Sequence, residues 1–238
     1  MAEAAASSAA RGRSKRRDLV EIAAAYGLIL AVIWTPRPWQ SFLWWVAAAG
    51  VLALIYASFE GFAAMGMRRE NFARSLWIAG AALLLAGAAM GVAAHEQTLK
   101  LPAGPLALLG TYCAYAIWAC VQQFLLQGFF LLRLLRLIPS AWLAALAAAL
   151  LFALAHMPST FLVPVTFLWG LAASLLFLRY RNLYPLALAH AILGVAVAMT
   201  IPGPVDHNMR VGLGYLHYSQ HHRHADRLYL SPQPSAKP

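Results

Sequence analysis

Charged residues are scarce in this chain, and acidic residues are the scarcest. Asp, Glu, Lys and Arg make up 11% of the 238 residues, with 8 acidic against 18 basic side chains. Soluble domains carry roughly one quarter charged residues, so this composition excludes an ordinary soluble protein. The chain has only 2 cysteines and no CxxC pair, which argues against a disulfide framework.

Strand-like alternation of apolar and polar residues is absent as well. Instead, 62% of the residues are hydrophobic, and they form long runs that are apolar on all sides, which excludes the strands of a membrane barrel. A membrane-spanning helix needs about 20 such residues. We therefore expect an all-α, polytopic transmembrane helical bundle of about seven spans: residues 19–34, 42–59, 76–94, 106–132, 141–156, 161–178 and 184–201.

Composition also divides the chain into four parts. Residues 1–18 read as a basic disordered N-terminal tail, residues 19–105 as N-terminal transmembrane helices, residues 106–201 as a helical core, and residues 202–238 as a polar, His-rich tail. Histidine clusters can bind metal, but this one lacks cysteine and a zinc-ligand spacing, so a solvated tail or a lid is favoured. Its histidines are His207, His217, His221, His222 and His224.

Basic residues predict the orientation in the membrane. With the N-terminus inside, twelve Lys and Arg residues fall in the inner segments, whereas the outer loops hold only Arg37 and Lys100. This asymmetry predicts a multi-pass protein of the inner (plasma) membrane with a cytoplasmic N-terminus and an external C-terminus. Membrane lipid is thus an expected partner. Nucleic acid is not, because the basic tail lacks interleaved aromatic residues that stack on bases.

Five polar residues interrupt the apolar runs and are the candidates for chemistry. They are Gln122, Gln123 and Gln127 in one run, and His156 and His190 in two later runs. Polar groups in hydrocarbon are costly unless they are paired or line a cavity. Gln123 and Gln127 share one helix face because they are four residues apart. Each residue alone could instead be an interhelical hydrogen-bonding group, and the span boundaries place the two histidines at different depths.

The order QQxxxQG (122–128), FxxxH (152–156) and a histidine on a late helix resembles the CPBP family of CAAX proteases and bacteriocin-processing proteins, also called Abi. That family carries EExxxR, FxxxH and HxxxN motifs on a four-helix core, and the resemblance covers about residues 106–201. It implies peptide-bond hydrolysis of a membrane-associated or lipidated substrate, with a protein, peptide or partner helix bound in the core.

The resemblance also implies roles for single residues. It puts the family's catalytic glutamate at Gln122, its neighbouring glutamate at Gln123 and its arginine at Gln127, with the two family histidines at His156 and His190. Glutamate and one histidine are thought to activate water in the family, while the other histidine and the asparagine stabilise the oxyanion. The asparagine position holds Gly194, and Phe152 and Gly194 are expected to line the substrate cavity.

Glutamine cannot replace glutamate as a general base, because an amide does not take up a proton near neutral pH. Catalytically, the chain is therefore interpreted either as an intramembrane endopeptidase with a substituted centre or as an inactive pseudoprotease that binds a helical or lipidated segment. A small-solute transporter is a third interpretation, which the absence of inverted repeats disfavours. No cofactor is expected, although His156 and His190 leave a metal open. Glu21 is expected to pair with Arg17, the alternative being a replacement carboxylate for the glutamine site.

Overall fold

The computed structural model describes residues 15–102 and 104–218, and every regular element in these residues is a helix. The all-α fold class is therefore confirmed. Each of the seven apolar runs forms a helix, and the ends lie within a few residues of the expected bounds except in the fourth run, where α6 ends at Phe124 and the helix continues to Leu137. These helices are α2 (Lys15–Ile33), α3 (Trp39–Ala57), α5 (Trp77–His95), α6 (Pro105–Phe124), α8 (Ala141–Leu154), α9 (Leu162–Tyr180) and α10 (Tyr184–Thr200).

Shorter elements join or extend the long helices. Between α3 and α5 lies α4 (Phe72–Ser75), and α6 continues through η1 (Leu125–Leu131) into α7 (Leu132–Leu137). After α10 come α11 (Gly203–Asp206), η2 (His207–Met209) and a last short helix at residues 212–218. Helix α2 begins at Lys15, so residues 15–18, which the sequence assigned to a disordered tail, are helical. The other residues of both predicted tails that precede 15 or follow 218 lie outside the described part of the chain.

The chain is a multi-pass membrane protein, but the count of seven spans is not confirmed. Four helical stretches in the described residues are long and apolar enough to cross a membrane: Trp39–Ala57, Phe72–His95, Pro105–Leu137 and Leu162–Tyr180. A fifth is added if α10 and the segment Gly203–Met209, bent by 120°, form one broken span. Helix α8 is shorter, with 14 residues, and the first turns of α2 carry five charged residues that shorten its apolar part.

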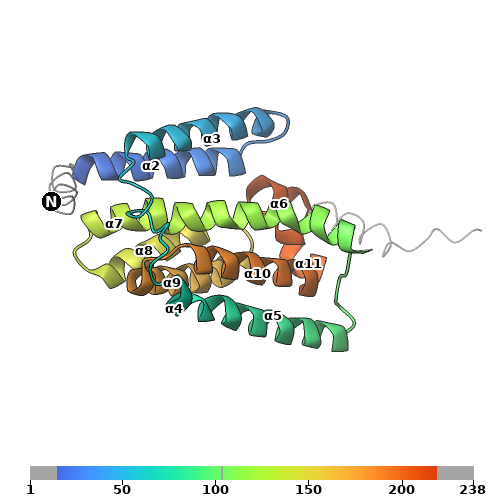
Figure 1. Cartoon of the computed structure of the whole chain (residues 1–238). Helices are drawn as coiled ribbons and strands as arrows, with labels where there is room; N and C mark the ends of the chain where they lie inside the picture. The colour runs from blue at the N-terminus through green and yellow to red at the C-terminus, as the bar shows by residue number, and fades with distance from the viewer. Residues whose placement is uncertain (1–14, 103, 219–238) are drawn as a thin grey trace, which may run out of the picture.

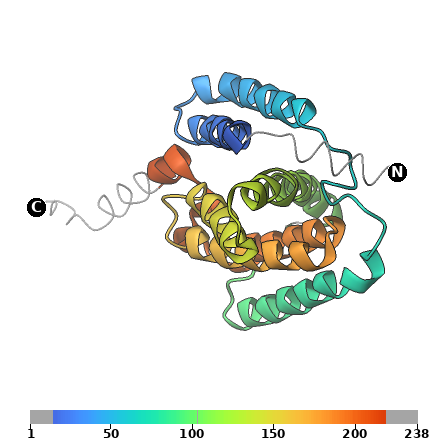
Figure 2. The same ribbon diagram turned by 90° about the vertical axis from the view of Figure 1, so that its left-hand side faces the viewer.

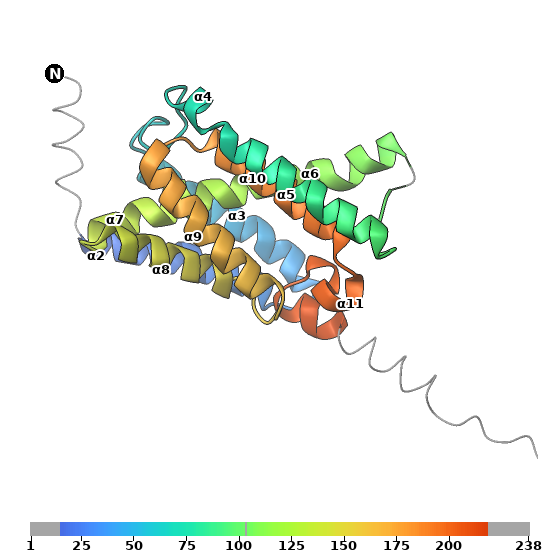
Figure 3. The ribbon, with the colours of Figure 1, turned by 90° about the horizontal axis from the view of Figure 1, so that it is seen from below.

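The helices form layers (Figure 1). The hairpin α2–α3 lies on one side of the long helix that runs from α6 to α7, and α8, α9 and α10 lie on its other side (Figure 2). Helix α5 packs against the outer side of α10, as the view from below also shows (Figure 3). The close helix pairs are α8 with α9, α10 with α5 and α6, and α2 with α3 and α7. The α6–α7 helix is thus the central element of the bundle.

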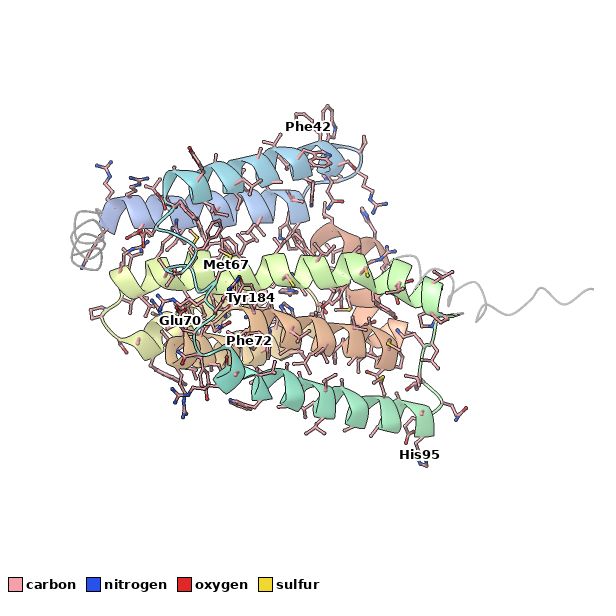
Figure 4. All side chains as sticks on the ribbon, viewed as in Figure 1. Phe42, Met67, Glu70, Phe72, His95 and Tyr184 are labelled. Carbon is pink, nitrogen blue, oxygen red and sulfur yellow. The ribbon has the colours of Figure 1, made fainter. Side chains whose placement is uncertain are left out.

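Small residues allow the tightest of these pairs to approach. Helix α8 buries a row of alanines, and a Cβ atom at Gly170 of α9 would lie only 3.3 Å from the Cα atom of Ala149. Close backbone approach at small residues is a common way for helices to pack in a membrane, where apolar burial does not drive association. Large apolar side chains instead face outward, as Figure 4 shows for Phe42 on α3, which is 67% exposed.

The loop between α3 and α4 is joined to the turn between α9 and α10. The Asn182 side chain donates hydrogen bonds to the backbone carbonyls of Arg68 and Glu70 at 2.8 and 2.9 Å. The Leu183 amide donates to the Gly66 carbonyl at 2.8 Å. Figure 4 shows Glu70 and Tyr184 near each other in this region. The loop after α3 is therefore held at the start of α10, the helix that carries His190.

Buried ion pairs attach the α2–α3 hairpin to the central helix. The carboxylate of Glu21 on α2 accepts from Arg17 at 2.9 Å, as expected, and also from Arg133 on α7 at 2.8 Å. Arg133 is 2% exposed, and its guanidinium lies 3.4 Å from the centre of the Phe129 ring. Because Glu21 is held by two arginines, it is a partner in this network rather than a replacement carboxylate for the glutamines.

A second pair extends this network toward the membrane surface. Arg136 on α7 donates two hydrogen bonds to the carboxylate of Asp18 on α2, at 2.8 and 2.9 Å. It also lies 3.2 Å from Glu60, in the loop after α3. The paired, planar geometry of an arginine with a carboxylate favours one relative position of the two groups. These hydrogen bonds therefore hold α2 and α7 at a fixed position relative to each other near the start of α2.

The Glu21→Ala substitution should destabilise the protein strongly. Removing this carboxylate leaves the buried Arg133 without its acidic partner, at a cost of about 3–5 kcal/mol. The matched control is Arg17→Ala, which breaks an exposed helical pair worth about 0.3–0.5 kcal/mol. Thermal unfolding of both variants in detergent micelles measures the difference. An E21A variant that melts with the native chain contradicts the structural role assigned to Glu21.

Candidate functional site

The glutamines lie where the central helix changes its winding. Residues Pro105–Leu137 form one helix of 33 residues, in which Leu125–Leu131 is a π-helix. Gln122 and Gln123 are near the end of the α-helical part, and Gln127 lies inside the π segment. A π segment widens the helix by an extra residue per turn and is frequent at functional sites. The sequence pattern contains no signal for this change of winding, because predominantly apolar residues continue through both parts.

Gln123 and Gln127 form a hydrogen-bonded chain with Trp169 of α9. The indole N–H of Trp169 donates to Oε1 of Gln123 at 3.1 Å, and Nε2 of Gln123 donates to Oε1 of Gln127 at 2.7 Å. An indole can only donate, so it determines which end of each amide accepts and which donates. Both glutamines are completely buried. The expectation that they share one helix face is confirmed.

The chain ends on an unpaired donor. Nε2 of Gln127 is buried and has no hydrogen-bond partner among the described residues. The side-chain amide of Gln127 cannot be flipped, because its Oε1 atom is already required as the acceptor for Gln123. Gln122 differs from the other two glutamines: its side chain is half-buried and forms no hydrogen bond with a described residue. The motif therefore contains a buried neutral pair and one amide that is open to a ligand.

His156 lies in the turn after α8, with its ring orientation set by the backbone. Its Nδ1 atom is 2.7 Å from the carbonyl oxygen of Phe152. A carbonyl can only accept, so Nδ1 carries the hydrogen and the lone pair of the neutral imidazole is on Nε2. This is the tautomer in which Nε2 can take up a proton.

The ring of Phe152 joins the two histidines. Its centre is 4.8 Å from that of His156 and 5.8 Å from that of His190 on α10. His190 also lies 5.8 Å from the Trp169 ring, and its buried Nδ1 atom has no partner among the described residues. The different depths expected for the two histidines do not separate them, because α8 ends at Leu154 and His156 turns back toward the core. Four helices thus contribute to one polar centre.

Gly194 lies one turn after His190 and is covered by a residue that the sequence analysis missed. A Cβ atom at Gly194 would overlap the hydroxyl group of Tyr115 on α6. Tyr115 is eight residues before Gln123. A stripe of residues spaced four apart therefore runs along the helix through Tyr115, Ala119, Gln123 and Gln127. This spacing could have identified Tyr115 from the sequence, whereas the contact of Tyr115 with α10 could not be predicted from it.

Carboxylates do not take part in this centre. No described acidic residue forms a hydrogen bond with the three glutamines or the two histidines, and Glu21 is engaged by Arg17 and Arg133. In the described residues there is also no group of three or more His, Cys, Asp or Glu side chains that could hold a metal ion. The chemistry available here is that of neutral amides, an indole, a phenol and two imidazoles.

An apolar groove lies beside the polar centre. It has a volume of about 390 Å³ and runs between α5, α6 and α10. Leu83, Leu109, Cys113 and Val195 are among its lining residues, and Tyr112 lines it from α6. Tyr112 is three residues before Tyr115 on the same helix. Tyr112 lines this groove, whereas the Tyr115 hydroxyl lies against Gly194.

The segment after α10 contacts the turn that carries His156. The Gly212 amide donates to the carbonyl of Met157, next to His156, at 2.7 Å. Gly212 has a φ of +54°, and a Cβ there would overlap Ile33 at the end of α2. This tight contact requires glycine. His207 stacks against Tyr215 with ring centres 4.0 Å apart, whereas the predicted cluster of His221, His222 and His224 lies outside the described residues.

Comparison with known families matches the segment of the chain that carries this centre. A family model described as type II CAAX prenyl endopeptidase Rce1-like matches residues 104–196. The matched range contains every residue of the polar centre, from Tyr115 to Gly194, and it confirms the resemblance to the CPBP family over this segment. No curated protein and no solved structure matches the chain.

The Trp169→Phe substitution tests the hydrogen-bonded chain. Phenylalanine keeps an aromatic ring against His190 but removes the N–H group that Gln123 accepts, leaving a buried oxygen unpaired. We expect a loss of stability of about 1–3 kcal/mol. The control is Trp142→Phe on α8, because Trp142 is 52% exposed and makes no such contact. Thermal unfolding in micelles compares the two, and equal melting temperatures contradict the chain as described.

Proposed function

We propose, from the match of residues 104–196 to an Rce1-like family model, that the chain binds a membrane-associated or lipidated peptide segment without cleaving it at the rate of a protease. One observation carries the proposal. Where the resemblance expects two glutamates and an arginine, the structure has a neutral chain from Trp169 through Gln123 to Gln127. A site that has lost its charges together, and has replaced them with paired amides, supports binding rather than hydrolysis.

The missing base accounts for the loss of ordinary hydrolysis. Gln122 cannot accept a proton from water, and the absence of a positioned general base typically costs about 10²–10⁴-fold in rate. Gly194 supplies no side chain to stabilise an oxyanion, and one such donor is worth roughly 10²–10³-fold. These two losses are not additive, but either one alone lowers the rate far below that of a typical enzyme.

Unpaired polar atoms support binding of a peptide. Nε2 of Gln127 and Nδ1 of His190 are both buried without a partner among the described residues. Leaving such a group unpaired costs about 1–3 kcal/mol, so a ligand or water that pairs with it is stabilised. A peptide backbone carries both acceptors and donors. The half-buried amide of Gln122 offers a further contact to such a segment.

A residual peptidase is the second candidate, and one contact favours it. The hydrogen bond from His156 Nδ1 to the Phe152 carbonyl leaves Nε2 with the lone pair that a general base needs. In this alternative His156 activates water directly, without the family's glutamate. The neutral amides would then bind the substrate while the imidazole performs the proton transfer.

The proposal includes the inner membrane as location, with a cytoplasmic N-terminus and an external C-terminus. Figure 1 supports it, because the start of α2, the end of α7 and the α9–α10 turn lie at one end of the bundle. These elements carry Lys15, Arg136 and Arg179, which the distribution of basic residues places inside. Membrane lipid and a lipidated peptide or partner helix are the partners that follow from this arrangement.

Binding and cleavage are separated by assaying both on one probe. We expect the full-length protein in nanodiscs to bind a fluorescent farnesylated CAAX-type peptide in an anisotropy titration and to release no product detectable by mass spectrometry. The His190→Ala variant should bind more weakly, because it removes the ring packed against Trp169 and Phe152.

Controls for this experiment decide between the two candidates. Cleavage by the native chain that is lost in His156→Ala supports the residual peptidase and overturns the non-cleaving function. Absence of binding to the farnesylated peptide and to its unprenylated form overturns the binding function. The Q122E/Q123E double variant restores the carboxylates, so a gain of cleavage in it shows that the rest of the centre is still arranged for hydrolysis.

A further inference from the structure

Tyr115 extends the polar stripe of the central helix. It lies about two turns before Gln123 on the same helix, and the residue between Tyr115 and Gln123 at the four-residue spacing, Ala119, is fully buried and small. Residues four apart on a helix have Cβ atoms about 5–6 Å from each other, so the stripe continues in regular steps.

Gly194 makes room for the Tyr115 hydroxyl. Any side chain at position 194 would begin where this hydroxyl group lies. On α10, Gly194 is one turn from His190 and faces the same direction, so the phenol and the imidazole are neighbours along one face. The position where the resemblance expects the amide of asparagine thus holds a hydroxyl from a different helix.

The hydroxyl is available as a donor. It forms no hydrogen bond with any described residue, and the Tyr115 side chain is half-buried rather than sealed in the core. Tyrosine hydroxyls inside proteins usually have a hydrogen-bond partner. A donor that is held in place by packing, next to His190 and without a partner, is arranged for an acceptor that comes from outside the chain.

We propose that the Tyr115 hydroxyl, seated against Gly194, donates a hydrogen bond to a backbone carbonyl of the bound peptide segment. This inference rests on the proposed binding function and adds a specific residue to it. The phenol supplies from α6 the neutral donor that position 194 of α10 cannot supply. A carbonyl bound there lies next to His190 and toward the outer end of the glutamine stripe.

The Tyr115→Phe variant tests the inference, with Tyr112→Phe as its matched control. Both variants remove one phenolic hydroxyl from the same helix, but Tyr112 lines the apolar groove. A neutral hydrogen bond is worth about 0.5–1.5 kcal/mol, so Y115F should bind the farnesylated peptide roughly 2- to 10-fold more weakly. Y112F should bind it as the native chain does. Thermal unfolding confirms that Y115F, which keeps the ring, is folded.

A set of modified peptides identifies the acceptor. In each member one backbone amide is replaced by a trans-alkene, which keeps the shape but has no carbonyl. We expect one member of the set to bind equally to the native chain and to Y115F. If Y115F is weakened equally for every member, the hydroxyl acts through packing and the inference is overturned. Binding of the unmodified peptide that is unchanged in Y115F overturns it as well, while leaving the proposed function intact.

A rescue variant tests the spatial argument separately. Gly194→Asn alone should destabilise the protein, because its side chain overlaps the Tyr115 hydroxyl. In the Tyr115→Ala/Gly194→Asn double variant that space is free, and the asparagine amide supplies a donor. We expect the double variant to bind the peptide more tightly than Tyr115→Ala. Equal binding of the two contradicts a donor at this position, and failure of the native chain to bind overturns the proposed function on which the inference rests.

Discussion

The cost of an unpaired polar group in apolar surroundings governs this structure. Within a membrane bundle, water is not freely available to pair with a buried amide or guanidinium, so such groups must meet one another across helices. Gln123 therefore bonds both Gln127 and Trp169, and Arg133 bonds Glu21 while resting on Phe129. These contacts link the central helix to α9 on one side and to α2 on the other. These contacts stabilise the positions of the helices, because a helix that moved would leave these polar groups unpaired.

The central helix separates charged from neutral chemistry along its length. Ion pairs gather near its C-terminal end, in α7, where Arg133 and Arg136 meet Glu21 and Asp18. Six residues earlier, Gln127 carries no charge and ends a chain of amides. A carboxylate at the position of Gln127 would need a basic partner, as Glu21 has in Arg133. The distribution thus supports a core that recognises polar groups of a peptide while its ionised residues hold the helices together.

The sequence predicted much of this architecture. Seven apolar runs became seven helices, and the four-residue spacing of Gln123 and Gln127 placed both on one face, because helix periodicity is a local property. It did not predict the π segment at Leu125–Leu131, because the same apolar pattern is compatible with an α-helix and with a π-helix. Nor did it predict that Phe152 lies between the two histidines, or that Tyr115 covers Gly194. Those contacts join residues far apart in the chain and depend on how helices end and pack.

By itself, the sequence determined the class of the protein and the identity of its polar residues. Hydrophobic runs require helices in a membrane, and the spacing of glutamines and histidines carries the family resemblance. Only the tertiary structure decided which polar groups are paired and which are open. Glu21 belongs to an ion-pair network, Gln123 donates a hydrogen bond to Gln127, and Gln122 and Tyr115 remain available. The reason is physical: a hydrogen bond depends on distance and direction between atoms, and in this bundle those are set by the packing of helices rather than by the order of residues.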